Sequence, residues 1–245
     1  MNRTERVLIL AGGKGRRLRP FTWVLPKPLV PIGELSILEI VIRQLRYYGL
    51  ARITLAVGHR ADLVMAVMGN GHRFGVEIDY SLEEKPLGTI GPLARFGELD
   101  DNVLVINGDT LTDLNYVDFL EYHEQQGGIA TIAAARRHTS VDFGTLTCDR
   151  NNRVISFSEK PSFDYIVSMG VYAFSPEILK WIPQDEPFWF DNLMENLLKA
   201  GEPVHIYPFH GRWLDVGRLE DYEKAVEEFD QNRSVYLPDM LPDTD

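Results

Sequence analysis

The first strong signal in the chain is a short apolar run, Val7-Leu8-Ile9-Leu10, which stops at the segment Ala11-Gly12-Gly13-Lys14-Gly15. A continuous apolar run of this length before turn residues is typical of a strand that is buried on both faces. Glycines directly after such a strand let backbone N–H groups approach a bound anion, because no Cβ stands in the way. The run therefore predicts a buried strand whose end faces a ligand.

Segments with helix and strand patterns alternate after this loop. Ser36-Ile37-Leu38-Glu39 has the spacing of a capping box and predicts a helix that ends near Tyr48-Gly49. The next expected strands are 52–57, 76–81 and 103–106, and the next expected helices are 62–68 and 115–125. This alternation favours an α/β fold with a mainly parallel sheet and helices on both faces.

The pattern changes after Gly127-Gly128. Strands are expected at 129–135, 144–148, 154–158 and 167–174, with no long helix between them. A helix at 188–200, a strand at 205–208 and a closing helix at 219–230 follow. Four strands in a row indicate either an extension of the sheet or a smaller α+β lobe. The polar residues 231–245 are expected to form a loosely held tail.

The overall composition excludes several classes of protein. The chain has 245 residues, a hydrophobic content of 44% and a net charge of −11, so its surface should repel nucleic acid and anionic membranes. Without a long apolar run or a signal-peptide pattern, the expected location is the cytoplasm. The single cysteine, Cys148, excludes an internal disulfide and a cysteine-based zinc site, and we expect it in the core at a strand end.

Cations gather in the segment after the first strand, in a protein that is otherwise acidic. Arg16, Arg17, Arg19 and Lys27 lie within twelve residues of one another. Pro26 and Pro28 flank Lys27 and should hold it in an extended segment that aims its ammonium group. An ordinary strand-to-helix connection with surface cations is the alternative. The length of the loop and its clustered charge favour a site for a phosphate-rich ligand.

Two aspartates stand at positions where ligands bind in α/β proteins. Asp109 follows the expected strand 103–106 in the sequence Asn107-Gly108-Asp109, and carboxyl ends of central strands face the ligand site in open sheets. Asp215 lies in the apolar segment Trp213-Leu214-Asp215-Val216-Gly217. The simpler alternatives are a turn residue for Asp109 and a helix cap for Asp215.

Several separated motifs resemble those of the sugar-1-phosphate nucleotidyltransferases. The segments Leu10–Thr22 and Pro26–Pro31 are similar to the family pattern L-A-G-G-x-G-T-R-L-x-P-x-T followed by P-K-P-L-x-P, with Arg16 at the usual threonine. Length and the ending Trp-Leu-Asp-Val-Gly look most like the short mannose-, heptose- or hexosamine-1-phosphate guanylyltransferases. The resemblance implies a Rossmann-like open sheet with a small α+β sugar-binding lobe.

The resemblance also assigns roles on the nucleotide side. Residues that would line the NTP are Leu10, Ala11, Gly12, Gly13, Gly15 and Arg17. Arg17 would bind the β- and γ-phosphates, and Lys27 would contact the phosphates at the reacting centre, so both are the candidate catalytic residues. Asp109 and Asp215 would bind Mg²⁺, which favours one or two carboxylates together with phosphate oxygens and water. Whether Arg16 contacts a phosphate or points to solvent stays open.

The sugar-phosphate side is implied by Ser158-Glu159-Lys160-Pro161 and two glycines. Lys160 would hold the phosphate of the sugar, Glu159 would accept hydrogen bonds from sugar hydroxyls, and the backbones of Gly144 and Gly170 would approach the sugar. A surface charge pair before a proline is the alternative for Glu159 and Lys160. The glycines could instead occupy a bulge or the interior of a strand.

The segment Glu83–Gly91 resembles the part of the family that recognises the base. Gly88 would let the backbone approach the base edge, and Glu83 matches a position that contacts the base. A carboxylate accepts hydrogen bonds only, and guanine offers N1–H and N2–H₂ as adjacent donors, which favours GTP. Glu84 or backbone groups remain alternatives for this recognition.

These observations predict one nucleotidyltransferase domain over residues 1–230. Its NTP-binding half would span about 1–128, its sugar-phosphate half about 129–218, and its closing helix 219–230. The expected reaction gives an NDP-sugar and pyrophosphate, with Mg²⁺ as cofactor. The alternatives are a thymidylyl-, uridylyl- or cytidylyltransferase of the same family, or a non-catalytic NDP-sugar-binding regulatory protein. The resemblance also makes a homodimer plausible.

Overall fold

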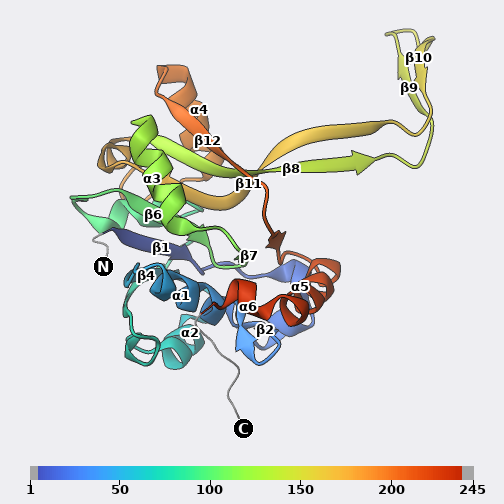
Figure 1. Ribbon diagram of the computed structural model, residues 1–245. Coiled ribbons are helices and arrows are strands. Elements are labelled where there is room, and N and C mark those ends of the chain that lie inside the picture. Colours follow the sequence, from blue (N-terminus) through green and yellow to red (C-terminus); the bar gives the residue numbers. More distant parts are fainter. Residues whose placement is uncertain (1–4, 239–245) are drawn as a thin grey trace.

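A seven-stranded sheet forms the centre of the computed structural model, which describes residues 5–238 (Figure 1). In sheet order the strands are β12 (Val204–Phe209), β8 (Ala130–Ser140), β11 (Ser162–Phe174), β6 (Val103–Asn107), β1 (Arg6–Leu10), β4 (Arg52–Val57) and β5 (Glu77–Leu82). Neighbouring strands are parallel from β6 to β5 and between β12 and β8, whereas β11 is antiparallel to both its neighbours. The prediction of a mainly parallel α/β sheet is confirmed.

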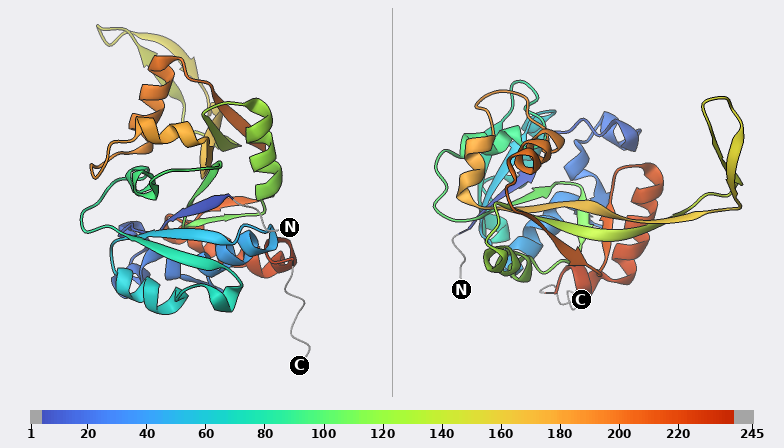
Figure 2. Two further views of the ribbon diagram at one scale, coloured as in Figure 1. Left: turned by 90° about the vertical axis from the view of Figure 1, so that its left-hand side faces the viewer. Right: turned by 90° about the horizontal axis from the view of Figure 1, so that it is seen from above.

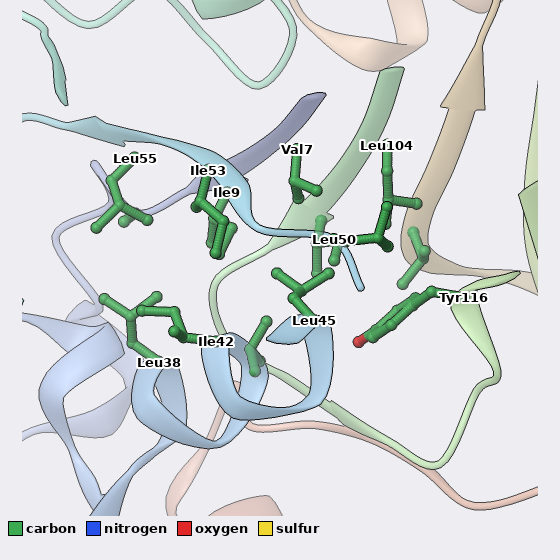
Figure 3. Packing of buried hydrophobic residues seen from close by; sticks show 14 of the residues in the cluster. Val7, Ile9, Leu38, Ile42, Leu45, Leu50, Ile53, Leu55, Leu104 and Tyr116 are labelled. Atoms are coloured by element: carbon green, nitrogen blue, oxygen red, sulfur yellow. The ribbon is translucent and has the colours of Figure 1, made fainter. Parts of the chain in front are cut away.

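Helices cover both faces of the sheet, as the alternation of buried side chains in β1 requires. Val7 and Ile9 pack into one apolar cluster with three helices, α1 (Ile37–Tyr47), α2 (Ala61–Met68) and α3 (Tyr116–Gln126) (Figure 3). Leu8 points to the other face and packs into a second cluster. That cluster includes α4 (Phe190–Ala200) and the 3-10 turns η5 (Gly91–Phe96) and η6 (Pro176–Trp181).

Side-chain caps set the starts of two of these helices, α1 and α3, at the positions that the sequence predicts. The Ser36 hydroxyl accepts a hydrogen bond from the backbone N–H of Glu39 at 3.2 Å and begins α1. The Asn115 side chain accepts bonds from the N–H groups of Val117 and Asp118 and begins α3. Such bonds satisfy N–H groups that have no partner inside the helix.

The end of the described chain packs onto the body of the protein. Helix α5 (Leu219–Gln231) is followed by a short helix, α6 (Arg233–Tyr236). Tyr236 and Leu237 are buried in a third apolar cluster with Phe229 of α5. The prediction of a loosely held tail is therefore wrong for residues 231–238, because these apolar side chains supply a packing surface. The remaining tail residues, 239–245, lie outside the described part of the chain.

Of the four consecutive strands, β8 and β11 belong to the main sheet, and the other two form a separate two-stranded sheet. Strands β8 and β11 pair inside the sheet and then continue beyond it as a two-stranded ribbon. The ribbon ends in the hairpin of β9 (Thr145–Cys148) and β10 (Val154–Ser158). We call residues 136–166 the arm, and Figures 1 and 2 show that it projects away from the body. Cys148 ends a strand as predicted, but it is exposed on the arm and not in the core.

One buried histidine gives the fold a sensitivity to acid. His123 is 1% exposed, and its ring nitrogens contact the hydroxyls of Thr131 at 2.8 Å and Ser175 at 3.1 Å. The Ser175 hydroxyl donates to the carbonyl of Gly128, so it accepts from Nε2–H, and Thr131 donates to Nδ1. Burial, and next the nearby His205, lower the pKa of His123 to about 4.

We therefore expect the protein to lose stability as the pH falls from about 6.5 to about 4. In this range the unfolded histidine binds a proton that the folded one excludes, and the loss is on the order of 3 kcal/mol. Urea unfolding at pH 7 and at pH 4.5 measures it. A His123→Gln variant should lack this part of the pH dependence, whereas His72→Gln, which changes an exposed residue, should keep it. Parallel pH curves for wild type and His123→Gln would contradict the assignment.

Candidate active site

A pocket of about 460 Å³ opens at the carboxyl ends of β1 and β6. Its walls include every residue that the sequence assigned to the nucleotide: Leu10, Ala11, Gly12, Gly13, Gly15, Arg17, Glu83 and Gly88. Lys27 and Asp109 also line it. The pocket therefore gathers residues that lie far apart in the sequence, from Leu10 to Gly217.

The glycine loop closes directly against Lys27. Gly15 has φ +56°, and a Cβ there would stand 2.9 Å from the side chains of both Lys27 and Thr22. The Thr22 hydroxyl donates to the Gly15 carbonyl at 2.8 Å and fixes this turn. Only glycine meets both demands, the left-handed backbone and the close approach.

The predicted conformation of Lys27 is only partly right. Pro26 is extended, with φ −62° and ψ 145°, but Lys27 begins the 3-10 turn η3 (Lys27–Leu29). The turn is closed by a hydrogen bond from the Val30 N–H to the Lys27 carbonyl. Lys27 is held by a turn rather than by an extended segment, and its ammonium still points into the pocket, where it forms an ion pair with Asp109.

Two carboxylates meet beside Lys27. Strand β13 (Trp213–Asp215) pairs antiparallel with β7 (Thr110–Thr112), and the Val216 N–H donates to the Asp109 carbonyl at 3.1 Å. This pairing places Asp215 next to Asp109. Desolvation, and next the negative charge of Asp109, raise the pKa of Asp215, while Lys27 and Arg17 act in the opposite direction. Two acidic groups are held together here against their mutual repulsion.

This pair fits a divalent cation that takes its other ligands from a substrate. Within residues 5–238 no group of three or more His, Cys, Asp or Glu side chains could hold a metal alone. Mg²⁺ is commonly bound by one or two carboxylates together with phosphate oxygens and water. Asp109 and Asp215 match that donor set, and their repulsion is the kind of cost that a cation relieves.

The two arginines of the loop flank the same pocket. Arg17 lies near the end of β13, the strand that carries Asp215, since a Cβ on Gly217 would stand 3.6 Å from Nη2 of Arg17. Arg16 also lines the pocket. Both are in the short 3-10 turn η1 (Arg16–Leu18), and both side chains reach solvent. Arg16 is thus both at the pocket and exposed to solvent, and whether it contacts a phosphate stays open.

Glu83 and Gly88 have structural contacts in addition to their place in the pocket. Oε2 of Glu83 accepts a hydrogen bond from the Leu87 N–H at 2.9 Å, and Oε1 lies against Gly12. Burial raises the pKa of Glu83. Gly88 has φ +78°, and a Cβ there would collide with the backbone carbonyl of Phe188. The segment Glu83–Gly91 is thus held by its own carboxylate and by the segment before α4.

The four sugar-phosphate candidates do not lie together. Gly170 does not line the pocket itself, but it lies against Asn107 of the pocket wall, because a Cβ there would collide with the Asn107 side chain. Gly144, Glu159 and Lys160 are exposed on the arm, where the ribbon meets the β9–β10 hairpin, and do not line the pocket. The structure therefore does not gather the four candidates in one place within the chain, and their role in binding a sugar phosphate stays a prediction. The candidates are apart because β8 and β11 pair with each other along the ribbon and carry the hairpin away from the body.

Sequence reasoning missed several lining residues. They are Pro28, Pro86, Thr89, Asn107, Gly108 and Gly217. Each lies within three residues of a site residue that the sequence analysis named. Including the sequence neighbours of each motif would therefore have found them. Gly108 shows the type of constraint involved, because its N–H donates to the Leu10 carbonyl and a Cβ would stand 2.9 Å from that oxygen.

Comparison with known proteins defines the class of this chain. Residues 6–232 match the family model of the nucleotidyl transferases, and the chain belongs to this family. A UTP–glucose-1-phosphate uridylyltransferase of Synechocystis is 32% identical over 90% of this chain, and a mannose-1-phosphate guanylyltransferase of Mycobacterium tuberculosis is 32% identical over 89%. The chain spans about 62% of the length of these curated relatives.

A solved structure supports the same grouping. HddC from Yersinia pseudotuberculosis is 30% identical, with a TM-score of 0.73 that covers 92% of this chain and 100% of HddC. A second HddC structure, complexed with GMP-PN, has a TM-score of 0.71 and 29% identity. Within residues 5–238, no helix combines the length and the apolar character that a membrane span requires.

Proposed function

We propose that this chain transfers a nucleotidyl group from an NTP, with GTP favoured, to a sugar 1-phosphate and releases pyrophosphate. The observation that carries the proposal is the convergence of Lys27, Arg17, Asp109 and Asp215 around one pocket beside a glycine loop. Cations and a carboxylate pair at the carboxyl ends of parallel strands suit a substrate that carries several phosphates.

The chemistry needs charge neutralisation more than proton transfer. A phosphate monoester has a second pKa near 6, so the oxygen of a sugar 1-phosphate is an ionised nucleophile at neutral pH. It would attack the α-phosphorus in line with the departing pyrophosphate. In this proposal Lys27 would contact the α-phosphate and Arg17 the departing β- and γ-phosphates, where a planar guanidinium can bind two oxygens at once. Mg²⁺ bound by Asp109 and Asp215 would supply further neutralisation of the phosphates.

Two features support guanine over other bases. Glu83 lines the pocket and offers carboxylate oxygens that complement the adjacent N1–H and N2–H₂ donors of guanine. Mannose-1-phosphate guanylyltransferases and an HddC complexed with GMP-PN are among the similar proteins, although a uridylyltransferase has the same 32% identity. The sugar is expected to be a mannose, heptose or hexosamine 1-phosphate.

The test is a matrix of five NTPs against a panel of sugar 1-phosphates with Mg²⁺, followed by pyrophosphate release. We expect the highest kcat/KM in the GTP row. No turnover with any combination, together with tight binding of an NDP-sugar, would instead support a regulatory protein. A silent GTP row with another NTP active would refute the base assignment alone.

A Glu83→Gln variant tests the base contact. Its amide oxygen can still accept from the Leu87 N–H, so the local fold is kept, but one acceptor for guanine is replaced by a donor. We expect kcat/KM for GTP to fall about 10- to 100-fold, because a hydrogen bond to a charged group contributes about 1.5–3 kcal/mol. Glu98→Gln, which changes an exposed residue outside the pocket, is the matched control. Equal losses with GTP and UTP would show that Glu83 only supports the loop.

A further inference from the structure

The arm exposes an unusual amount of apolar surface. Among the described residues, eight of the nineteen large hydrophobic side chains that are exposed lie between 143 and 166, including Phe143 at 76%, Ile155 at 63% and Phe157 at 62%. A two-stranded ribbon in water is marginally stable by itself. Exposed apolar side chains gathered in one segment in this way favour a protein contact.

Contacts at the root of the arm hold its outward direction. The indole N–H of Trp213 donates to the Met169 carbonyl in β11 at 3.0 Å. The Arg137 guanidinium of β8 stacks over the Trp213 ring at 4.5 Å from its centroid. One side chain thus contacts both strands of the ribbon where they leave the sheet. The arm leaves the body along the course seen in all views (Figures 1 and 2).

The junction between the ribbon and the β9–β10 hairpin presents a cation and a carboxylate. Lys160 has φ +44°, a left-handed backbone that a residue with a Cβ adopts at a cost. The carboxylate of Glu159 lies beside Gly144, where a Cβ would stand 3.1 Å from Oε2. All three residues are exposed, and none contributes to the pocket of its own chain. The polar residues of the arm and the pocket of the same chain are therefore separate in space.

We infer that two copies of this chain exchange arms, so that Glu159 and Lys160 of one copy reach the pocket of the other and bind the sugar phosphate there. The inference rests on the proposed function. The arm has five Arg or Lys and four Asp or Glu residues, whereas the whole chain has a net charge of −11, so the arm can approach the acidic body of a second copy without the repulsion that two acidic bodies would meet. Because each copy has one arm and one pocket, a two-fold symmetric pair completes both sites and covers both arms.

Complementation between inactive variants tests this exchange. Arg17→Ala disables the pocket and Lys160→Ala disables the arm, and each homodimer should lose at least about 100-fold in kcat/KM. A heterodimer of the two variants, purified through two different tags, contains one site with an intact pocket and an intact arm. We expect about half of the wild-type activity per dimer. A heterodimer as inactive as its parents would overturn the exchange, because it would show that each arm serves its own pocket.

A second measurement does not depend on activity. Ser140 and Ser162 are paired across the ribbon, so residues 141–161 can be replaced by Asn-Gly, which closes a tight hairpin. Sedimentation equilibrium should show a wild-type dimer and at least a tenfold weaker dimer for the shortened chain, with unchanged far-UV circular dichroism. A monomeric wild type, or a shortened chain that dimerises equally well, would refute the inference. A wild-type dimer that turns over no NTP would refute the proposed function instead and leave the arm-mediated dimer standing.

Discussion

Replacing either Asp109 or Asp215 with asparagine should lower kcat/KM at least about 100-fold, because each substitution removes one of two carboxylates that fit a divalent cation. The two side chains are brought together by the pairing of β7 with β13, and the charge of Asp109 raises the pKa of Asp215. Affinity for Mn²⁺ in the presence of nucleotide, measured by paramagnetic resonance, should fall in both variants. Steady-state assays of pyrophosphate release give the activity.

Stability measurements separate loss of the site from loss of the fold. In metal-free protein, Asp215→Asn removes one of two repelling charges, so the Tm should not fall. Asp101→Asn, in an exposed loop, is the control and should keep activity, Mn²⁺ affinity and Tm. If either Asp109→Asn or Asp215→Asn retained full activity, that residue would be removed from the site.

Replacing Lys27 with methionine should have the second large effect, on activity and stability together. The Lys27 and Asp109 side chains are 12% and 19% exposed and form an ion pair, so the substitution leaves two neighbouring carboxylates without their cation. Removing one partner of a well-buried pair costs about 3–5 kcal/mol. Partial exposure reduces this to on the order of 1–3 kcal/mol here. We also expect a fall in kcat of at least about 100-fold, because the charge at the reacting phosphate is lost.

A double variant distinguishes the two effects. Adding Asp109→Asn to Lys27→Met removes the unpaired carboxylate and should restore most of the lost Tm without restoring activity. Added Mg²⁺ should raise the Tm of Lys27→Met more than that of wild type, since the metal replaces the missing positive charge. If Lys27→Met kept its activity while losing stability, Lys27 would have a structural role only.

The elements that the sequence predicted well are those specified by neighbouring residues. The buried strand at 103–106 is a continuous apolar run, and the start of α3 is set by Asn115, so both follow from local chemistry. The pocket was predicted for a similar reason, because short motifs at strand ends meet at one edge of a parallel sheet. The meeting of Lys27 with Asp109 follows from that arrangement.

What the sequence did not predict depends on contacts between distant segments. Gly88 is required by the backbone of Phe188, a hundred residues further along the chain. Tyr236 is buried only because α5 and the loop after β1 offer an apolar surface for it. The course of the arm has no local signal either, since both faces of the ribbon carry exposed apolar side chains and no alternation marks a core side.

The position of Trp213 makes it a natural optical reporter. Its indole bonds to the root of the arm through Met169 and stacks with Arg137, and it lies two residues before Asp215. Any movement of the arm relative to the carboxylates must therefore change the polarity around this ring, which governs its emission. Of the four tryptophans in the chain, the other three are Trp23, Trp181 and Trp189, and a protein that retains Trp213 alone would report that movement by fluorescence, without any attached dye.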